Sequence, residues 1–239
     1  MKAIKLDITG LINSFRVMDF HAYQKTHLFP PKTTIIGMIG SAMGIPPEEA
    51  NELTKRLQIA IIIKAVEGET KDLWKYLKYK SGQMPIRGVL IRELLYKSRY
   101  SVYLASIDQT LLDLVIEKLH APEWALSLGR EDELVKLDSI EEVELEYRDK
   151  LSYNNTVLPF DITRTGYSVD SNFIKGSLLR TRTRIIPPTV CRLPMRFEYT
   201  PKGRRPVDFQ EFTTIYNLQV TPHQNAGGYV DGDNHFQFF

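Results

Sequence analysis

The stretch FPPKTTIIGMIGSAMG, residues 29–44, decides the first half of the fold. Its proline pair fixes an extended approach to an apolar helix, which we expect from about Thr33 to Met43 with Thr33 or Thr34 as the N-cap. Glycines stand at positions 37, 40 and 44, and each costs roughly 1 kcal/mol relative to alanine inside a helix. We therefore expect something to pack very close to this helix, and packing within the fold is the commoner reason for such spacing.

Regular elements are expected on both sides of this helix. Alternation and helical periodicity indicate a strand over residues 2–9, a helix over 46–58, a strand over 59–66, two strands within 86–106 that divide at Lys97-Ser98, a helix from Ser106 or Asp108 to about His120, and a strand within 134–146. This order is that of a ferredoxin-like (RRM-type) split βαβ fold, which leaves one sheet face available for ligands. The sequence thus predicts an α+β protein with a ferredoxin-like domain over residues 1–150.

The remainder of the chain lacks a clear helical period. Turn residues separate short β-leaning segments from Leu151 onward, so we expect a smaller β-rich region with a basic arm over residues 151–220. Residues 221–239 contain Gly-Gly, Asp-Gly and Asp-Asn pairs, which predict a flexible tail unless a partner holds its last aromatic residues.

Composition narrows the class of protein. A single cysteine, Cys191, permits no intramolecular disulfide and no cysteine-based zinc site, which suits a reducing compartment. The first ten residues lack the apolar region of a signal peptide, and the run at 59–66 is too short to span a bilayer. We expect a cytoplasmic protein without a membrane partner.

Charge is distributed unevenly along the chain. The net charge is only +2, but residues 106–149 hold thirteen acidic against four basic side chains, and residues 159–205 hold ten basic against three acidic. Such a bipolar chain fits a protein with one side toward a polyanion and another toward solvent or a basic neighbour. Two ordinary solvated faces would produce the same pattern.

Basic and aromatic side chains alternate in RVMDFHAYQKTH, residues 16–27. Single-stranded RNA is bound by such mixtures, because bases stack on aromatic rings while cationic side chains neutralise phosphates. An exposed loop whose aromatics cover the edge of the core is the alternative. The candidate RNA-binding residues here are Arg16, His21, Tyr23 and Lys25.

Three further groups could bind an anion. Arg180, Arg182 and Arg184 in LLRTRTRI would project from one side of a strand or arm, where their mutual repulsion calls for phosphates or an acidic surface. Gly129 in SLGRED, residues 127–132, should make a turn that aims Arg130, with Glu131 and Asp132 as possible ion-pair partners. The third group, at the start of the glycine helix, consists of Lys32, Thr33 and Thr34.

Several enzyme classes are disfavoured. The G-x-x-x-x-G-K-S/T order of a P-loop is absent, so an NTPase is not expected. The histidines at 21, 27, 120, 223 and 235 are scattered, and no carboxylate pair has a suggestive ligand spacing. We predict no metal and no cofactor.

Four segments of the chain together resemble one known family. The chain resembles the Cas-five family of the RAMP superfamily in GLINSFRVMDF (10–20), in FPPKTTIIGMIG (29–40), in SLGR (127–130) and in LPMRFEY (193–199). The resemblance implies a ferredoxin-like core and a non-catalytic RNA-binding subunit that caps the 5′ handle of CRISPR RNA. It also implies that the protein nucleates a type I Cascade antiviral complex. Implied partners are a Cas-seven-type backbone subunit, a Cas-eight-type large subunit and, less directly, the helicase-nuclease and target DNA.

Two alternatives remain open. One branch of that family cuts precursor RNA without metal. The general base, general acid and phosphate stabiliser of such a reaction could come from among Tyr23, His21, Lys25 and His27, with His21, Tyr23 and Lys25 as the catalytic candidates. The cutting branch has adjacent lysine and histidine in its catalytic loop, however, and no Lys-His dipeptide occurs here. A ferredoxin-like protein-interaction module unrelated to RNA is the second alternative.

Overall fold

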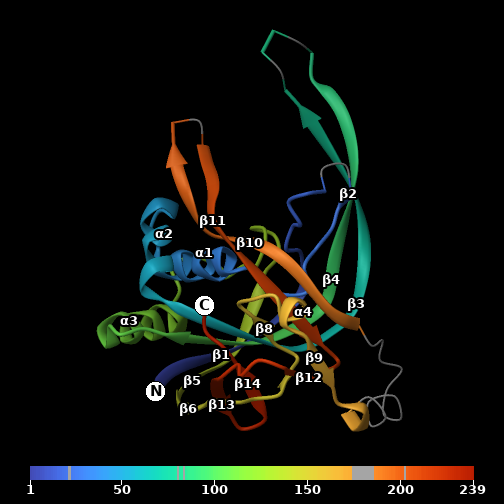
Figure 1. The fold of residues 1–239 in the computed structure, drawn as a ribbon. Helices are drawn as coiled ribbons and strands as arrows, with labels where there is room; N and C mark the ends of the chain where they lie inside the picture. Colours follow the sequence, from blue (N-terminus) through green and yellow to red (C-terminus); the bar gives the residue numbers. More distant parts are fainter. Residues whose placement is uncertain (21–22, 80, 83, 174–185, 202) are drawn as a thin grey trace.

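The predicted ferredoxin-like order is present in the computed structural model, which describes residues 1–20, 23–79, 81–82, 84–173, 186–201 and 203–239. The elements of this half are β1 (Lys2–Asn13), β2 (Tyr23–Gln24), α1 (Lys32–Met43), α2 (Pro47–Arg56), β3 (Gln58–Lys78), β4 (Ile86–Ala105), α3 (Gln109–His120) and β5 (Val135–Glu144). The main sheet has the order β3-β4-β1-β5 with antiparallel neighbours, and the short β2 joins β4 in parallel. Helices and sheet together form the α+β fold that the sequence predicts (Figure 1).

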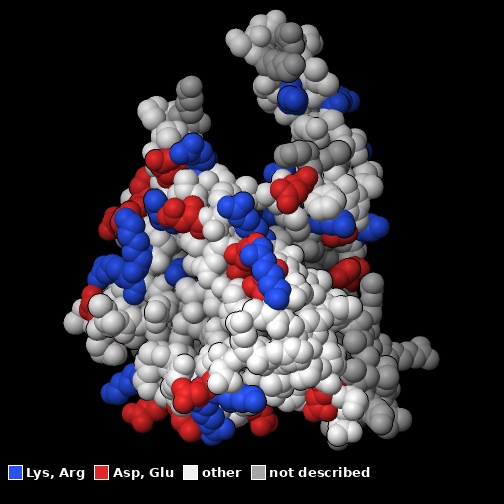
Figure 2. All heavy atoms as spheres, in the orientation of Figure 1, with Lys and Arg blue, Asp and Glu red and all other residues white. Residues whose placement is uncertain are grey.

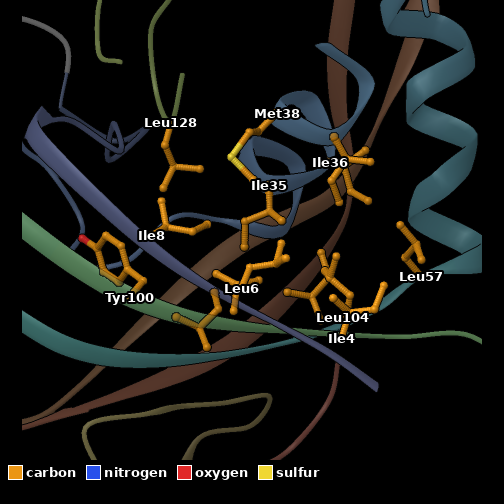
Figure 3. Close-up of a cluster of buried hydrophobic side chains, with 14 of the residues drawn as sticks. Ile4, Leu6, Ile8, Ile35, Ile36, Met38, Leu57, Tyr100, Leu104 and Leu128 are labelled. Atoms are coloured by element: carbon orange, nitrogen blue, oxygen red, sulfur yellow. The ribbon is translucent and has the colours of Figure 1, made fainter. Parts of the chain in front are cut away.

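The core lies between one sheet face and the helices. Alternate residues of β1, among them Leu6 and Ile8, meet Ile35 and Met38 of α1, and all four side chains are fully buried (Figure 3). Burying one such side chain contributes roughly 1.5–3 kcal/mol relative to leaving it in water. This packing fixes α1 across the sheet.

The glycines of α1 have three different explanations. A Cβ on Gly40 would lie 2.5 Å from the Cβ of Ala50, so this glycine lets α2 pack against α1. Gly44 ends the helix in the left-handed conformation, with a φ of 69°. Gly37 faces open space, because a Cβ there would meet nothing within 4 Å. A Cβ on Gly44 would also lie 2.8 Å from the side chain of Glu123, so close packing is confirmed at two of the three positions.

The expected threonine N-cap is wrong. The N-cap residue is Pro31, whose carbonyl oxygen accepts the amides of Thr34 and Ile35 at 2.9 and 3.2 Å. Because the helix begins at Lys32, both threonines lie inside its first turn and make no cap hydrogen bond.

The strands β3 and β4 form one long hairpin, whose outer part, residues 67–95, projects from the sheet and is called the arm below (Figure 1). Its turn lies between Lys78 and Ile86, so the division predicted at Lys97-Ser98 is wrong. Lys97 has a φ of 47° and stands at an irregularity inside β4. Leu95 and Tyr100 both face the core although they are five residues apart, so the alternation of buried and exposed side chains is interrupted between them. In the sequence this interruption looks like a turn.

Short strands dominate the second half. They and one short helix are β6 (Glu146–Arg148), β7 (Tyr153–Asn154), β8 (Val157–Leu158), α4 (Ile162–Thr165), β9 (Tyr167–Val169), β10 (Ile186–Thr200), β11 (Gly203–Tyr216), β12 (Gln219–Pro222), β13 (Gly228–Asp231) and β14 (Asn234–Phe236). Three small sheets result, with the orders β10-β11-β8, β7-β12-β9 and β14-β13-β6. Within the described part of the chain, no helix is long and apolar enough to cross a membrane.

Residues 221–239 differ from the flexible tail that we expected. Phe236 stacks on Tyr103 of β4 with ring centroids 4.1 Å apart, and the main chains of Phe239 and Ile59 exchange two hydrogen bonds of 2.9 and 3.0 Å. The aromatic rings have a partner within the chain, because they cover the part of the second sheet face near Ala60 and Tyr103. The turn pairs only connect these strands.

The two helix glycines provide a matched test of packing. We expect Gly40→Ala to lower the free energy of unfolding by about 1–3 kcal/mol, because α2 must move away from the new methyl group. Gly37→Ala should raise it by up to about 1 kcal/mol, because the methyl group meets no atom and alanine favours the helix. Urea unfolding of both variants measures the difference, and equal effects would contradict the assigned packing.

Candidate nucleic-acid interface

A buried carboxylate organises the end of β1. Glu133, only 3% exposed, accepts the amide of Ser14 at 2.7 Å, the hydroxyl of Ser14 at 2.5 Å and the amide of Arg130 at 3.2 Å. Gly129 has a φ of 120°, and a Cβ there would lie 2.1 Å from the Oε2 atom of Glu133. The turn predicted at Gly129 is therefore confirmed, and it brings Arg130 to the arm.

Two guanidinium groups meet one indole ring there. The Cζ atom of Arg130 lies 4.2 Å from the ring centroid of Trp74, and that of Arg92 lies 5.7 Å from it. Arg92 is held by Asp72 at 3.2 Å and by Glu133 at 3.4 Å. Among the described residues, the Nε atoms of both arginines are buried without a hydrogen-bond partner. The Nε atom of Arg130 lies 3.6 Å from a carboxylate oxygen of Asp132, one of the two ion-pair partners expected for it. Because both Nε atoms are buried, a bound group would contact the outer part of Arg130, whose side chain is 32% exposed.

An aromatic ring continues this arrangement along the arm. Tyr76 lies 6.4 Å from Trp74 between ring centroids, and it lies across Gly88, where a Cβ would be 2.5 Å from the ring. We call the series Tyr76, Trp74, Arg92 and Arg130 the aromatic–arginine row. Rings and guanidinium planes of this kind stack on nucleobases, and the arginines can also bind phosphates.

The other face of the arm is aliphatic. Leu73 and Ile91 are paired across the two strands, and the neighbouring pairs on this face place Val89 and Leu77 beside them. Leu73 is 60% exposed and Val89 57% exposed. We call Leu73, Leu77, Val89 and Ile91 the aliphatic face. So many exposed apolar side chains on a projecting hairpin indicate contact with another molecule.

Charge on the outer part of the arm, residues 73–92, has one sign. Between Asp72 and Glu93 the sequence contains five basic residues, Lys75, Lys78, Lys80, Arg87 and Arg92, and no acidic residue. Figure 2 accordingly shows Lys and Arg but no Asp or Glu on the outer part of the arm. The arm therefore carries a positive field toward any anionic neighbour.

The predicted residues of segment 16–27 do not form one line. Tyr23 donates its hydroxyl to Glu93 at 2.7 Å, and this bond raises the pKa of Tyr23. The ammonium of Lys25 lies 4.6 Å from the ring centroid of Phe20. Arg16 is exposed, and His21 is outside the described residues. Tyr23 and Lys25 therefore lie near the base of the arm, but in separate pairs.

The anion site expected at the start of α1 is not formed as predicted. Lys32 is only 7% exposed and donates from its ammonium to the main-chain oxygen of Phe239 at 3.0 Å. Burial lowers the pKa of Lys32 to about 8. This amine thus serves the fold, and Thr33 and Thr34 lie apart from the aromatic–arginine row. The predicted residues Arg180, Arg182 and Arg184 lie outside the described residues.

The sequence reading missed Trp74, Tyr76 and Arg92. Their signal was the period-two placement of Asp72, Trp74 and Tyr76, together with the lack of acids in residues 73–91. The predicted division of β4 at Lys97 left no long hairpin in the expected fold, so these residues were not expected to share a face. Among the residues that the structure describes, no cluster of His, Cys, Asp or Glu could hold a metal ion.

Comparison with known proteins identifies the family of the chain. The model of the family described as CRISPR-associated protein (Cas_Cas5) matches residues 3–159, about two thirds of the chain. The chain belongs to this family. The match spans the ferredoxin-like domain, including the arm and the Gly129 turn of this Cas5 chain.

Solved structures share the fold of the Cas5 chain. A chain of a CRISPR RNA-guided surveillance complex has a TM-score of 0.56 at 14% identity, covering 93% of this chain and 92% of that one. A CRISPR protein from Archaeoglobus fulgidus has a TM-score of 0.53 at 16% identity, covering 99% and 98%. No curated protein matches the sequence.

One histidine beside the interface should make stability depend on pH. His27 is partly buried, 6.1 Å from Phe29 between ring centroids, and burial lowers its pKa from 6.5 to about 4 while Asp19 opposes the shift. The unfolded chain then binds a proton that the folded protein does not, so the free energy of unfolding should fall as the pH drops from 6.5 to 4. The loss is at most about 3 kcal/mol.

Urea unfolding between pH 7 and pH 4 measures this loss. His27→Gln should flatten the profile over that window, whereas the exposed His120→Gln should leave it unchanged. An equal slope in wild type and His27→Gln would show that other groups cause the dependence.

Proposed function

We propose that this Cas5 protein is a non-catalytic, RNA-binding subunit of a CRISPR ribonucleoprotein complex. In the finer form of the proposal, it caps the 5′ handle of CRISPR RNA and nucleates a type I Cascade complex for antiviral defence. The observation that carries RNA binding is the contact of Arg130 and Arg92 with the indole ring of Trp74, because a ring and guanidinium planes in one row can stack on bases.

RNA capture would use the two parts of the row differently. Trp74 and Tyr76 offer flat surfaces, and each base stacked on an aromatic ring contributes about 1–3 kcal/mol. Arg130 comes from a loop beside the arm and is partly exposed, so its guanidinium can reach a phosphate. Arg92 is engaged by Asp72 and Glu133, so it positions Trp74 and orients the site.

The aliphatic face supports binding of a protein partner. RNA bases do not need an aliphatic surface, whereas a subunit interface typically buries apolar side chains with cationic ones at its rim. The exposed positions of Leu73 and Val89, with Lys75 and Arg87 beside them, fit a neighbour with an apolar, acid-rimmed surface. The proposed neighbour is a Cas-seven-type backbone subunit. A Cas-eight-type large subunit and, indirectly, the helicase-nuclease and target DNA complete the proposed set of partners.

The geometry gives little support to the cleavage alternative. A general base must release its proton near neutral pH, but the hydrogen bond to Glu93 raises the pKa of Tyr23. Lys25 lies over Phe20, so its ammonium is not paired with the Tyr23 hydroxyl. Capture without cleavage therefore remains the proposal.

Binding of the cognate repeat RNA in EDTA tests this function. We expect a shifted band on a native gel without cleavage products. Trp74→Ala should weaken binding about 5- to 100-fold with an unchanged salt slope, because stacking is lost. Arg130→Ala should weaken binding and reduce the salt slope by about one, because one phosphate contact is lost.

The matched control is Arg148→Ala. Arg148 lies in β6, away from the arm (Figure 1), and its substitution removes the same charge as Arg130→Ala. It should change affinity much less than Arg130→Ala. Equal effects of the two substitutions would show that the row contributes only non-specific charge. No binding would refute RNA capture. A product with a 2′,3′-cyclic phosphate would establish the nuclease.

The aliphatic face has a separate test. Leu73→Ser with Val89→Ser should reduce co-purification of the backbone subunit at least tenfold while thermal unfolding and RNA affinity stay near wild type, because both side chains are already in water. Val190→Ser, another exposed valine outside the arm, is the control. Unchanged co-purification of the double variant would exclude this face as the interface.

A further inference from the structure

A crevice of about 330 Å³ opens between α1, α2 and the β10–β11 hairpin, away from the arm. Its volume is within the usual range of small-molecule sites, roughly 300–1,000 Å³. The side chains and backbone around it include Thr33, Gly37, Ser41, Trp124, Phe197 and Arg204.

The walls of the crevice are built firmly. The side chain of Asn51 in α2 donates to the carbonyl oxygen of Phe197 and accepts its amide, each at 2.9 Å. This pair of bonds ties the hairpin to the helix. Arg204 lies with its guanidinium carbon 4.8 Å from the ring centroid of Phe197. The crevice is thus a fixed feature between two elements.

The floor of the crevice, by which we mean the backbone of α1 at Gly37, carries no side chain. Gly40 and Gly44 are explained by Ala50 and by the left-handed end of α1, but a Cβ on Gly37 would meet no atom within 4 Å. Glycine weakens a helix interior, so no contact within the chain accounts for this residue. A group from outside the chain that approaches the backbone of α1 would account for it.

The lining favours an anionic, planar group. It contains one arginine, hydroxyl groups from Thr33, Ser41 and Thr54, and no Asp or Glu. Trp124 is part of this lining and is 64% exposed, and its ring contacts no other aromatic ring or cation among the described residues. The Thr54 hydroxyl already donates to the carbonyl oxygen of Asn51, but an apolar side chain from a protein would offer no hydrogen bond to the hydroxyls of Thr33 and Ser41 or to the guanidinium of Arg204. A nucleotide would supply a ring for stacking, polar edges for the hydroxyls and a phosphate for the guanidinium.

We propose that this crevice binds one nucleotide of the RNA strand, with its base between Trp124 and the Gly37 backbone and its phosphate at Arg204. The inference rests on the proposed RNA-binding function and adds a second contact point, separate from the aromatic–arginine row. The strand would then reach across the helix face of the protein as well as the arm.

The two tryptophans of the chain report on the two sites separately. In Trp74→Phe the remaining tryptophan, Trp124, belongs to the crevice, and in Trp124→Phe the remaining Trp74 belongs to the row. Each variant is titrated with cognate single-stranded RNA that carries the 5′ handle, and quenching of tryptophan fluorescence is recorded. We expect quenching in both variants.

Substitutions at Gly37 then block or spare the crevice. In the Trp74→Phe background, Gly37→Leu should abolish quenching of Trp124 and weaken RNA affinity roughly tenfold, because its side chain fills the floor. Gly37→Ala is the control, and it should retain most of the quenching. Thermal unfolding shows that both variants are folded. Trp124→Ala, at an exposed position, should weaken binding to a similar extent.

The possible outcomes separate the two proposals. Quenching of Trp74 without any response of Trp124 would overturn the nucleotide site and leave the proposed function standing. Quenching of Trp124 that Gly37→Leu does not change would also overturn the site. A response of Trp124 to the backbone subunit, and none to RNA, would assign the crevice to a protein. No response at either tryptophan, and no gel shift, would remove both proposals.

Discussion

A single buried carboxylate holds the candidate interface together. Glu133 accepts hydrogen bonds from the residue after β1 and from its own loop, and it also pairs with Arg92 of the arm. A buried charge without partners would be costly, so Glu133 requires all three segments to meet at one point. Gly129 permits this meeting, because any side chain there would collide with Glu133 and with the carbonyl oxygen of Ser14. This junction places the guanidinium of Arg130 over the ring of Trp74.

The long β3–β4 pair gives one element two chemistries. Its inner half is locked into the sheet by buried residues such as Ile61 and Leu104, so the outer half leaves the protein in a fixed direction. Side chains alternate between the two faces of a strand pair, so the adjacent residues Leu73 and Trp74 lie on opposite faces. A ring-and-guanidinium surface suited to RNA and an aliphatic surface suited to protein thus occur back to back. Such an arm can contact an RNA strand and a neighbouring subunit together.

Closure of the second sheet face shapes the remaining surface. The fold leaves that face open for ligands in principle, but Phe236 and its neighbours occupy the part around Tyr103. Aromatic burial here removes apolar area from water and fixes Phe239, whose main-chain oxygen receives Lys32. The two surfaces that we propose for an RNA strand, the arm and the crevice beside α1, lie elsewhere. Both are open because no segment of the described chain packs over them.

Apart from the division of β4, the sequence by itself determined the order of the elements in the first half and the position of α1, because the strand and helix periods and the proline pair are local signals. It also determined the turn at Gly129, since only glycine adopts that backbone conformation readily. Tertiary structure decided what local patterns do not contain. The irregularity at Lys97 keeps β4 continuous, and partners distant in sequence bring Trp74 to Arg130 and Phe236 to Tyr103. Contacts of this kind depend on how the elements pack, and no spacing along the chain encodes them directly.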